Sequence, residues 1–239
     1  MAGTPVGENP VVSALSRRAR GGGADPLLTW YRPETGARTE LSVRTVANWV
    51  DKTANLLEEL GAERAVAGPV SAAHPGHWMS LVWPLAAWQR GLAYVAGAPD
   101  ATCEVVVTGP EDPRAHAGLT TLACSLHPLG LGLRGLGDGV LDFSTEALAQ
   151  PDAHAAVAVP ASALAWSGDG SARSHGDTGL VAPRAGRVLV RPSTAWETLA
   201  SALLGPVLGG GSAVVVEGPV EPEALARIVA AERTTGPVA

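Results

Sequence analysis

A short run of small polar residues, LAWSGDGSARSHGD at 164–177, carries most of the side chains that could do chemistry. Its glycines allow backbone N–H groups to converge on an anion, and its serines add hydroxyl donors. These residue types favour a loop that cradles a phosphate. The residues that form this candidate phosphate loop are Ser167, Gly168, Asp169, Gly170, Ser171 and Arg173.

Two features of the loop oppose phosphate binding. The Asp169 carboxylate places a negative charge beside the expected anion, and the segment contains no lysine. A guanidinium also binds phosphate, so Arg173 could replace the lysine, and the sequence leaves this open. The spacing GxxxxGK[ST] of a nucleotide-binding P-loop is absent.

Three other chemistries fit the chain less well. A Ser/His/Asp hydrolase holds its serine on a GxSxG elbow with the His and the acid far away in sequence, and no GxSxG occurs here. The glycines at 130–135 match GxGxxG, but further glycines follow at once and oppose the helix that this motif must open. His74 and His77 are three residues apart, yet no third metal ligand stands out.

Composition narrows the class of protein. Only one of the 17 basic residues is a lysine, Lys52, so any mechanism that needs another lysine is excluded. The net charge of −6 without a basic block makes nucleic acid an unexpected partner. The apolar runs are too short to span a membrane, and the N-terminus lacks an export pattern, so we expect a cytoplasmic protein. Cys103 and Cys124 are expected to be buried free thiols, without a redox or metal role.

The spacing of apolar residues predicts alternating helices and strands. An apolar stripe from Val43 to Leu60 predicts a helix that Ser42 caps and Gly61 ends, with Lys52 on its solvent side. Further helices are expected at 10–20, from Pro75 to about Gly91, and at 143–150, 193–204 and 222–232. Strands are expected at 27–31, 38–41, 66–73, 92–95, 104–108, 121–126, 161–166, 187–190 and 213–216.

This alternation predicts an α/β fold with a mostly parallel sheet flanked by helices and a small N-terminal hairpin. Residues 1–26 are expected to form an N-terminal helix and linker, residues 27–235 a single α/β domain, and residues 236–239 a tail. The glycine-rich loop at 130–139 could join two halves of the domain, 27–129 and 140–235.

Several segments, taken in order, resemble the N-terminal part of the adenylate-forming superfamily, which includes acyl-CoA synthetases, peptide-synthetase adenylation domains and luciferases. Residues 41–61 are similar to its helix T-Y-x-E-L-x-x-x-x-N-x-x-A-N-x-L. Residues 86–95 are similar to A-x-x-K-A-G-A-x-Y-V-P, and residues 187–216 to the region of P-L-x-x-G-A-x-V-V-L. The similarity runs from about Leu27 to Thr235 and is closest to a short actinobacterial group of truncated relatives.

The candidate loop falls where that superfamily keeps its phosphate loop, T-S-G-T-T-G-x-P-K-G. Only Ser167 and Gly168 are retained clearly, and Ser174 stands at the lysine position. The Thr-Thr-Gly positions hold Asp169, Gly170 and Ser171. The later family segments, among them the metal-binding glutamate and the catalytic lysine of the C-terminal domain, find no counterpart before Ala239.

Acyl-adenylate formation needs cations and a metal ion at the α-phosphate. The resemblance therefore implies a non-catalytic relative, a pseudoenzyme without a cofactor, that binds an unknown small molecule or protein. Two alternatives stay open. The chain could be a diverged ligase that binds ATP or AMP with Mg²⁺ and is completed by a partner chain. It could instead be a structural module that forms homo- or hetero-oligomers through an exposed sheet edge.

Overall fold

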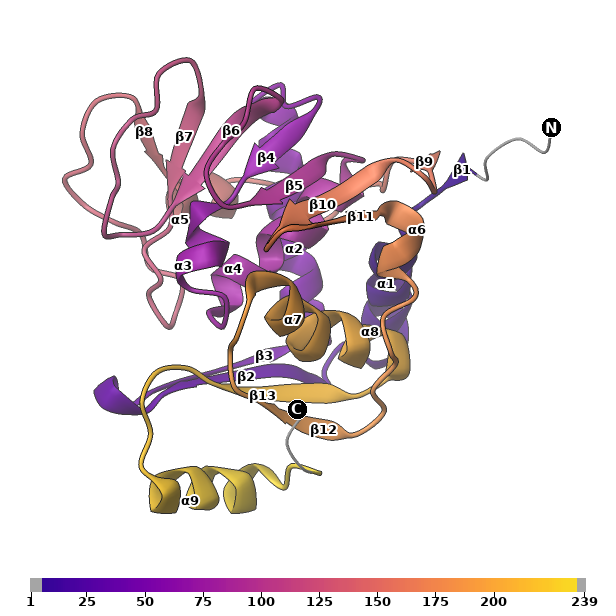
Figure 1. Ribbon diagram of the computed structural model, residues 1–239, viewed down its shortest axis with the longest axis vertical. Helices are drawn as coiled ribbons and strands as arrows, with labels where there is room; N and C mark the ends of the chain where they lie inside the picture. The colour runs from indigo at the N-terminus through magenta and orange to yellow at the C-terminus, as the bar shows by residue number, and fades with distance from the viewer. Residues whose placement is uncertain (1–5, 236–239) are drawn as a thin grey trace.

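Two β-sheets organise residues 6–235, the part of the chain that the computed structural model describes (Figure 1). The larger sheet has the strand order β11-β10-β5-β4-β6-β7-β8 and is parallel except for the β10–β11 pair. Its strands are β4 (Ala65–Ala67), β5 (Ala93–Ala96), β6 (Cys103–Thr108), β7 (Thr120–Ala123), β8 (Val140–Asp142), β10 (Leu164–Gly168) and β11 (Ser171–Ser174).

The smaller sheet has the strand order β12-β13-β2-β3. It contains β2 (Pro26–Arg32), β3 (Ala37–Ser42), β12 (Arg187–Val190) and β13 (Ser212–Val216). Strands β2 and β3 form the expected hairpin, with a 3₁₀ turn at Pro33–Thr35 between them, and β2 pairs in parallel with β13. A separate antiparallel pair joins β1 (Val6–Gly7) to β9 (Val159–Pro160). The predicted α/β class with a mostly parallel sheet is confirmed.

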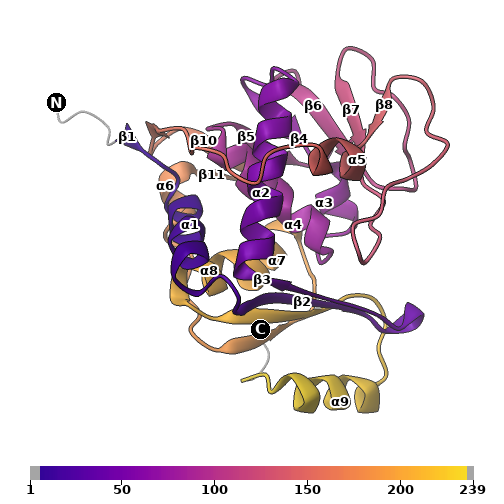
Figure 2. The same cartoon turned by 180° about the vertical axis from the view of Figure 1, so that it is seen from behind.

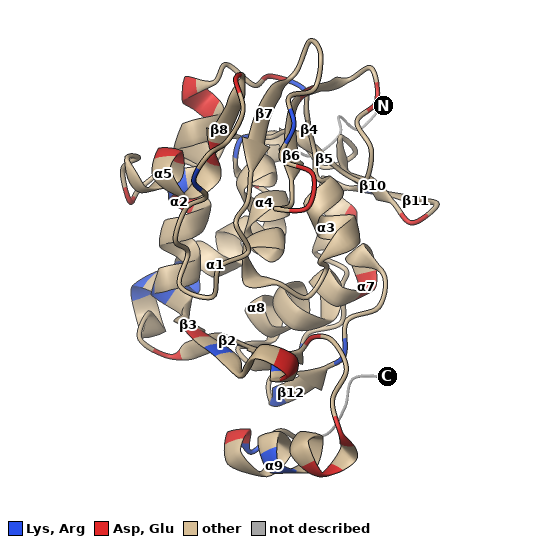
Figure 3. Ribbon diagram, turned by 90° about the vertical axis from the view of Figure 1, so that its left-hand side faces the viewer, with Lys and Arg blue, Asp and Glu red and all other residues tan. Residues whose placement is uncertain are grey.

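Helices fill the space between the sheets and cover the back of the molecule (Figures 1 and 2). They are α1 (Pro10–Gly22), α2 (Val43–Glu59), α3 (Pro69–Ala73), α4 (Trp78–Gln89), α5 (Phe143–Leu148), α6 (His175–Thr178), α7 (Ala195–Leu199), α8 (Gly205–Gly209) and α9 (Pro222–Glu232). All twelve residues of α4 are buried, as a helix that is apolar on every side must be. Figure 3 shows α3, α4 and α8 without a charged residue.

Local sequence signals account for α2. The Ser42 hydroxyl accepts a hydrogen bond from the backbone N–H of Thr45 at 3.1 Å, and the predicted apolar stripe is buried. Lys52 corrects the prediction of a solvated side chain. It is 17% exposed, and its ammonium donates to the Gln150 carbonyl at 2.5 Å and pairs with Asp152 at 2.6 Å. Lys52 therefore ties α2 to the segment that follows α5.

Several predicted elements differ in extent from the observed ones. The helix expected from Pro75 begins at Trp78, and the strands expected at 121–126 and 161–166 lie at Thr120–Ala123 and Leu164–Gly168. Two further differences have a clear physical basis. The strand expected at 66–73 stops at Ala67, because the backbone turns at Gly68, where a Cβ atom would lie 1.6 Å from the Tyr94 hydroxyl. The helix expected at 193–204 does not end before Gly205. A π-helical turn at Ala200–Leu204 leads into α8 and places Pro206 in its first turn, where the missing N–H is tolerated.

The two sheets interleave along the chain. The smaller sheet takes β2 and β3 from before residue 129 and β12 and β13 from after residue 140. The glycine-rich loop at 130–139 connects β7 to β8, which are neighbours in the larger sheet. The division into halves 27–129 and 140–235 stays a prediction. The predicted tail at 236–239 lies outside the described residues, as do residues 1–5.

The core contains both cysteines as free thiols, as predicted. The Trp83 indole N–H donates to the Cys124 sulfur at 3.3 Å, and burial raises the pKa of the Cys124 thiol to about 12. Within residues 6–235, the helices are too short or too polar to cross a lipid bilayer.

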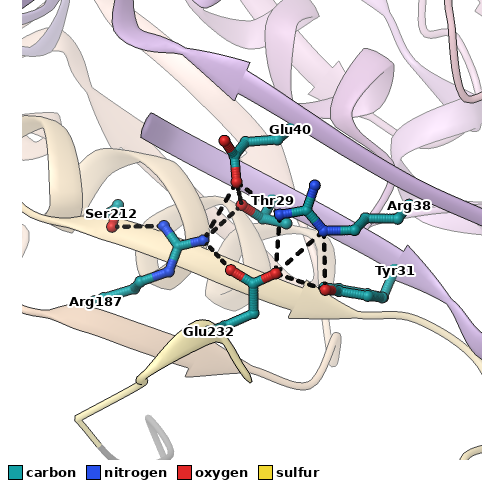
Figure 4. Close-up of polar contacts among 7 residues, drawn as sticks. All are labelled: Thr29, Tyr31, Arg38, Glu40, Arg187, Ser212 and Glu232. Atoms are coloured by element: carbon teal, nitrogen blue, oxygen red, sulfur yellow. Dashed lines mark hydrogen bonds and ion pairs between the residues drawn. The ribbon is translucent and has the colours of Figure 1, made fainter. Parts of the chain in front are cut away.

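Helix α9 rests on the outer face of the smaller sheet and buries none of its residues fully. Its Leu225, Ile228 and Val229 pack on that face, and Glu232 closes a polar network at the end of the helix (Figure 4). The Glu232 carboxylate accepts hydrogen bonds from Tyr31 at 2.5 Å, from Arg38 at 2.9 Å and from Arg187. Burial acts to raise the pKa of Glu232, but these three hydrogen bonds outweigh it and lower the pKa to about 2.

Replacing Glu232 therefore tests how α9 is held. We expect Glu232→Gln to lower the free energy of unfolding in urea by about 1–3 kcal/mol near neutral pH, because Arg38 and Arg187 each lose one of their two carboxylate partners and keep Glu40. Because the pKa of Glu232 is lowered in the folded state, its carboxylate stabilises the fold fully at pH values above its ordinary pKa of 4.5. This stabilisation is lost as the pH falls toward 2. The difference from wild type should thus shrink as the pH is lowered through this range. Glu223→Gln, an exposed change on the same helix, serves as the control, and an equal effect of both variants would contradict the assignment.

Candidate functional site

The predicted phosphate loop is a tight β-hairpin. Strands β10 and β11 pair up to Gly168 and Ser171, so only Asp169 and Gly170 connect them. Asp169 has a φ of 52° and Gly170 a φ of 69°, which is the conformation of a two-residue type I′ turn. Such a turn leaves no ring of backbone N–H groups large enough to surround a phosphate.

Both serines of the loop, Ser167 and Ser171, form part of this hairpin. Ser167 lies within β10, where it pairs with Val95 of β5 on one side and with Ala172 of β11 on the other. The Ser171 hydroxyl donates to the Gly168 carbonyl at 3.1 Å and closes the turn. The glycine at 168 is required by packing, because a Cβ atom there would lie 2.9 Å from the Cβ of Ala96.

Asp169 binds the start of helix α7. Its carboxylate accepts a hydrogen bond from the backbone N–H of Trp196 at 3.0 Å, and the Thr194 hydroxyl accepts one from Glu197 at 3.3 Å. The first N–H groups of a helix have no partner within the helix and carry a partial positive charge. The anion that satisfies this helix end is thus the protein's own carboxylate.

The Arg173 side chain lies over the ring of Trp196. Its guanidinium carbon lies 5.4 Å from the centre of the indole ring, and one guanidinium N–H donates to the Ala172 carbonyl at 3.0 Å. The Trp196 ring in turn packs 5.3 Å from the buried ring of Trp166. The structure therefore brings Asp169 and Arg173 together around Trp196, and not around an open loop.

Trp196 also lines two adjoining cavities of about 420 and 630 Å³. We call their combined surface the Trp196 groove. It is formed by Arg173, Asp177, Leu180, Val181, Ala182, Arg184, Val190, Arg191, Ser193, Trp196, Glu197, Ala200 and Ser201. Three arginines and two acids face this space, and Leu180 beside it is 81% exposed. The groove thus combines cationic groups with an apolar floor.

The sequence analysis singled out the segment of Asp169 and Arg173 but did not identify Trp196, which both residues contact. The residue lies within the helix predicted at 193–204, and its role arises from contacts with residues more than twenty positions earlier. Local spacing carries no signal for such a contact.

The other Ser, His and Asp residues of the segment are structural. Ser174 and Asp177 form a capping box at α6, with the Ser174 N–H donating to the Asp177 carboxylate at 2.8 Å. Burial lowers the pKa of His175 to about 4, so its ring is neutral near pH 7, and its Nδ1 accepts from the Asn9 amide at 3.1 Å. No Ser/His/Asp hydrogen-bond relay exists among them, and this pattern joins α6 to the residues before α1.

The histidine pair at 74 and 77 is divided between two roles. His74 pairs with Glu111 at 2.9 Å, whereas the His77 Nδ1 accepts from the Met79 N–H at 3.2 Å and begins α4. Between residues 6 and 235, no group of three or more His, Cys, Asp or Glu side chains could hold a metal ion.

Comparison with known proteins finds a relative by sequence and solved structures with a similar fold. No known protein-family profile matches it. A Mycobacterium tuberculosis protein described as a TIGR03089 family protein is 32% identical over 227 residues, covering 88% of this chain and 90% of that protein. A Brucella canis acyl-CoA synthetase superposes with a TM-score of 0.72 at 19% identity over 99% of this chain. An anthranilate CoA ligase in complex with anthranoyl-AMP superposes with a TM-score of 0.68 at 15% identity over 94%.

The chain spans 48% of the length of each of these two solved structures. Its fold is that of the N-terminal subdomain of adenylate-forming enzymes, as the sequence resemblance predicted. At this level of identity, the likeness to the solved enzymes establishes the shared architecture.

The contact between Asp169 and α7 generates a prediction about stability. Asp169→Gly keeps the positive φ but removes the carboxylate, so we expect the free energy of unfolding to fall by about 0.5–2 kcal/mol in urea. Asp169→Asn keeps an oxygen acceptor and a residue that tolerates this turn, and it should retain most of the stability. Wild-type stability in the glycine variant would show that the carboxylate does not hold the hairpin to the helix.

Proposed function

The chain belongs to the TIGR03089 family, and we propose that it is a non-catalytic relative of the AMP-dependent acyl-CoA synthetases that binds a small carboxylic acid in the Trp196 groove. The observation that carries this proposal is the hydrogen bond from the Trp196 N–H to the Asp169 carboxylate inside a two-residue turn. A nucleotide phosphate would have to displace that carboxylate and open the hairpin.

The positions of the cations support the absence of adenylation. Acyl-adenylate formation develops negative charge at the α-phosphate, which cationic groups and a metal ion must stabilise. Lys52 is held by Gln150 and Asp152 near the middle of α2, and Arg173 lies over the Trp196 ring. Both cations thus already have partners within the protein.

The Trp196 groove supports binding of an organic anion. Arg184 and Arg191 line the larger cavity together with the Trp196 ring, so a carboxylate and an apolar body can be bound side by side. An arginine can bind a carboxylate with two parallel hydrogen bonds, and an indole provides a flat surface for an aromatic ring. One solved protein of this fold holds anthranoyl-AMP, so in that protein the fold accommodates an aromatic acyl group.

A second candidate function is a ligase assembled from two chains. The observation that favours it is the superposition on about half of each solved synthetase over nearly all of this chain. In that case the missing catalytic groups would be supplied by a partner, and ATP or AMP with Mg²⁺ would bind at the hairpin. The same Asp169 contact argues against this alternative, because it occupies the helix end that would face the phosphates.

The absence of adenylation is tested directly by pyrophosphate exchange. We expect the purified chain, mixed with ATP, Mg²⁺ and a panel of aliphatic and aromatic carboxylic acids, to exchange no labelled pyrophosphate into ATP above a protein-free blank. Exchange by the chain alone would contradict the proposal. Exchange that requires an added protein from the same cell would support the two-chain ligase.

Binding in the Trp196 groove is tested by thermal stability and by tryptophan fluorescence. We expect benzoate, phenylacetate or indole-3-acetate to stabilise the protein, by about 2.7 kcal/mol at a hundred times its dissociation constant. Arg184→Gln and Arg191→Gln should each weaken binding by roughly tenfold, which is the loss of one charged hydrogen bond. Arg227→Gln, an exposed change on α9 outside the groove, is the matched control. Equal binding by all three variants would place the ligand elsewhere.

A further inference from the structure

A separate cavity of about 510 Å³ lies between α1, α2 and residues 153–156. Figure 2 shows these two helices along the back of the molecule. We call this cavity the α1–α2 cleft. Its floor includes the buried side chains of Val12 and Leu15, and its walls carry charged groups of both signs.

The charges of the α1–α2 cleft are separated by sign. The end of α1 lies next to the start of α2, where the Arg44 N–H donates to the Gly23 carbonyl at 2.9 Å. This contact brings Arg20, in the last turn of α1, and Arg44, in the first turn of α2, to one end of the cleft. Glu8, before α1, and Asp51, two helical turns beyond Arg44, lie toward the other end.

The Asp51 carboxylate is half-buried and held in place. It accepts a hydrogen bond from the Gln89 amide at 2.6 Å, and Gln89, only 4% exposed, also donates to the His154 carbonyl at 3.1 Å. Burial raises the pKa of Asp51, and the hydrogen bond from Gln89 acts to lower it. The charged side chains that act on it are His154 and Asp152.

Both ends of the cleft lack protein counter-ions. Among residues 6–235, neither Asp51 nor Arg44 nor Arg20 forms an ion pair within 4.0 Å. The Arg20 guanidinium donates to the Ser16 hydroxyl at 2.7 Å, and this hydroxyl is a neutral acceptor that does not balance the positive charge. A ligand with a positive charge at one end and a negative charge at the other would therefore supply a counter-ion to both ends of the cleft.

We propose that the α1–α2 cleft binds a small zwitterion, with an ammonium group on the Asp51 carboxylate and an anionic group between Arg20 and Arg44. Seven residues of α-helix separate the Cα atoms of Arg44 and Asp51 by about 10 Å, and the arginine side chains shorten this gap. A flexible ω-amino acid of four to eight carbons spans such a distance. This site is independent of the Trp196 groove, since the two cavities share no lining residue.

Other classes of ligand do not match the two opposite charges of the α1–α2 cleft. A nucleotide or another polyanion would be repelled by Glu8 and Asp51, and a simple amine or fatty acid would satisfy only one end. The buried part of Val12 and Leu15 offers apolar surface to the methylene chain between the two charged groups.

Isothermal titration of the whole chain tests the site with 4-aminobutyrate, 6-aminohexanoate and 8-aminooctanoate, each compared with hexanoate and hexylamine. We expect saturable binding of at least one zwitterion, at least roughly tenfold tighter than either singly charged compound. Asp51→Asn, which keeps an acceptor for Gln89, and Arg44→Gln should each weaken that binding by roughly tenfold or more. Arg17→Gln, an exposed change on α1 outside the cleft, should leave it unchanged.

Several results would overturn the assignment. They are the absence of saturable binding of all three zwitterions up to about 10 mM, equal affinity for hexanoate, or unchanged affinity in both cleft variants. If Asp51→Asn fails to give the wild-type circular dichroism spectrum, the exposed variant Arg44→Gln decides alone. Benzoate binding at the Trp196 groove is measured in the same variants. It should be unaffected by Arg44→Gln, so failure of one site is distinguished from failure of the other.

Discussion

The hydrogen bond between the Asp169 carboxylate and the Trp196 N–H connects the elements of the two sheets. It joins the β10–β11 hairpin of the larger sheet to α7, whose following turn packs on the smaller sheet. Because the first N–H groups of a helix lack partners within it, the carboxylate stabilises the start of α7. The Arg173 guanidinium lies over the Trp196 ring and adds a cation–π contact to the same junction.

Much of the fold could be predicted from the sequence, because its signals are local. The apolar stripe and the Ser42 cap define α2, and the turn after β2 defines the hairpin with β3. Other features depend on contacts that local patterns do not report. Gly68, where β4 has ended, packs against the Tyr94 hydroxyl of another strand, and a π-helical turn carries the chain past Pro206. The burial of Lys52 depends on a segment almost a hundred residues away.

The candidate site shows the same division. The sequence singled out the segment from Ser167 to Arg173, and the family resemblance implied the remnant of a phosphate loop there. The Asp-Gly pair between two strand-like runs is itself a signal for a two-residue hairpin, and it describes the observed turn better. What the sequence could not provide is the partner of each side chain. Asp169 and Arg173 both contact Trp196, and His175 accepts a hydrogen bond from Asn9. These partners are distant in the sequence and come together only in the folded protein.

The pairing of β2 with β13 has a consequence for how the molecule forms. Leu28, near the start of the chain, lies opposite Ala213, near its end, in the middle of the smaller sheet. During synthesis on the ribosome, β2 therefore has no partner strand on the side away from β3 until β13 has emerged. Contacts between such distant residues slow folding, and an open edge can pair with another nascent chain. This sheet is thus the part of the molecule for which we expect chaperone assistance to matter most.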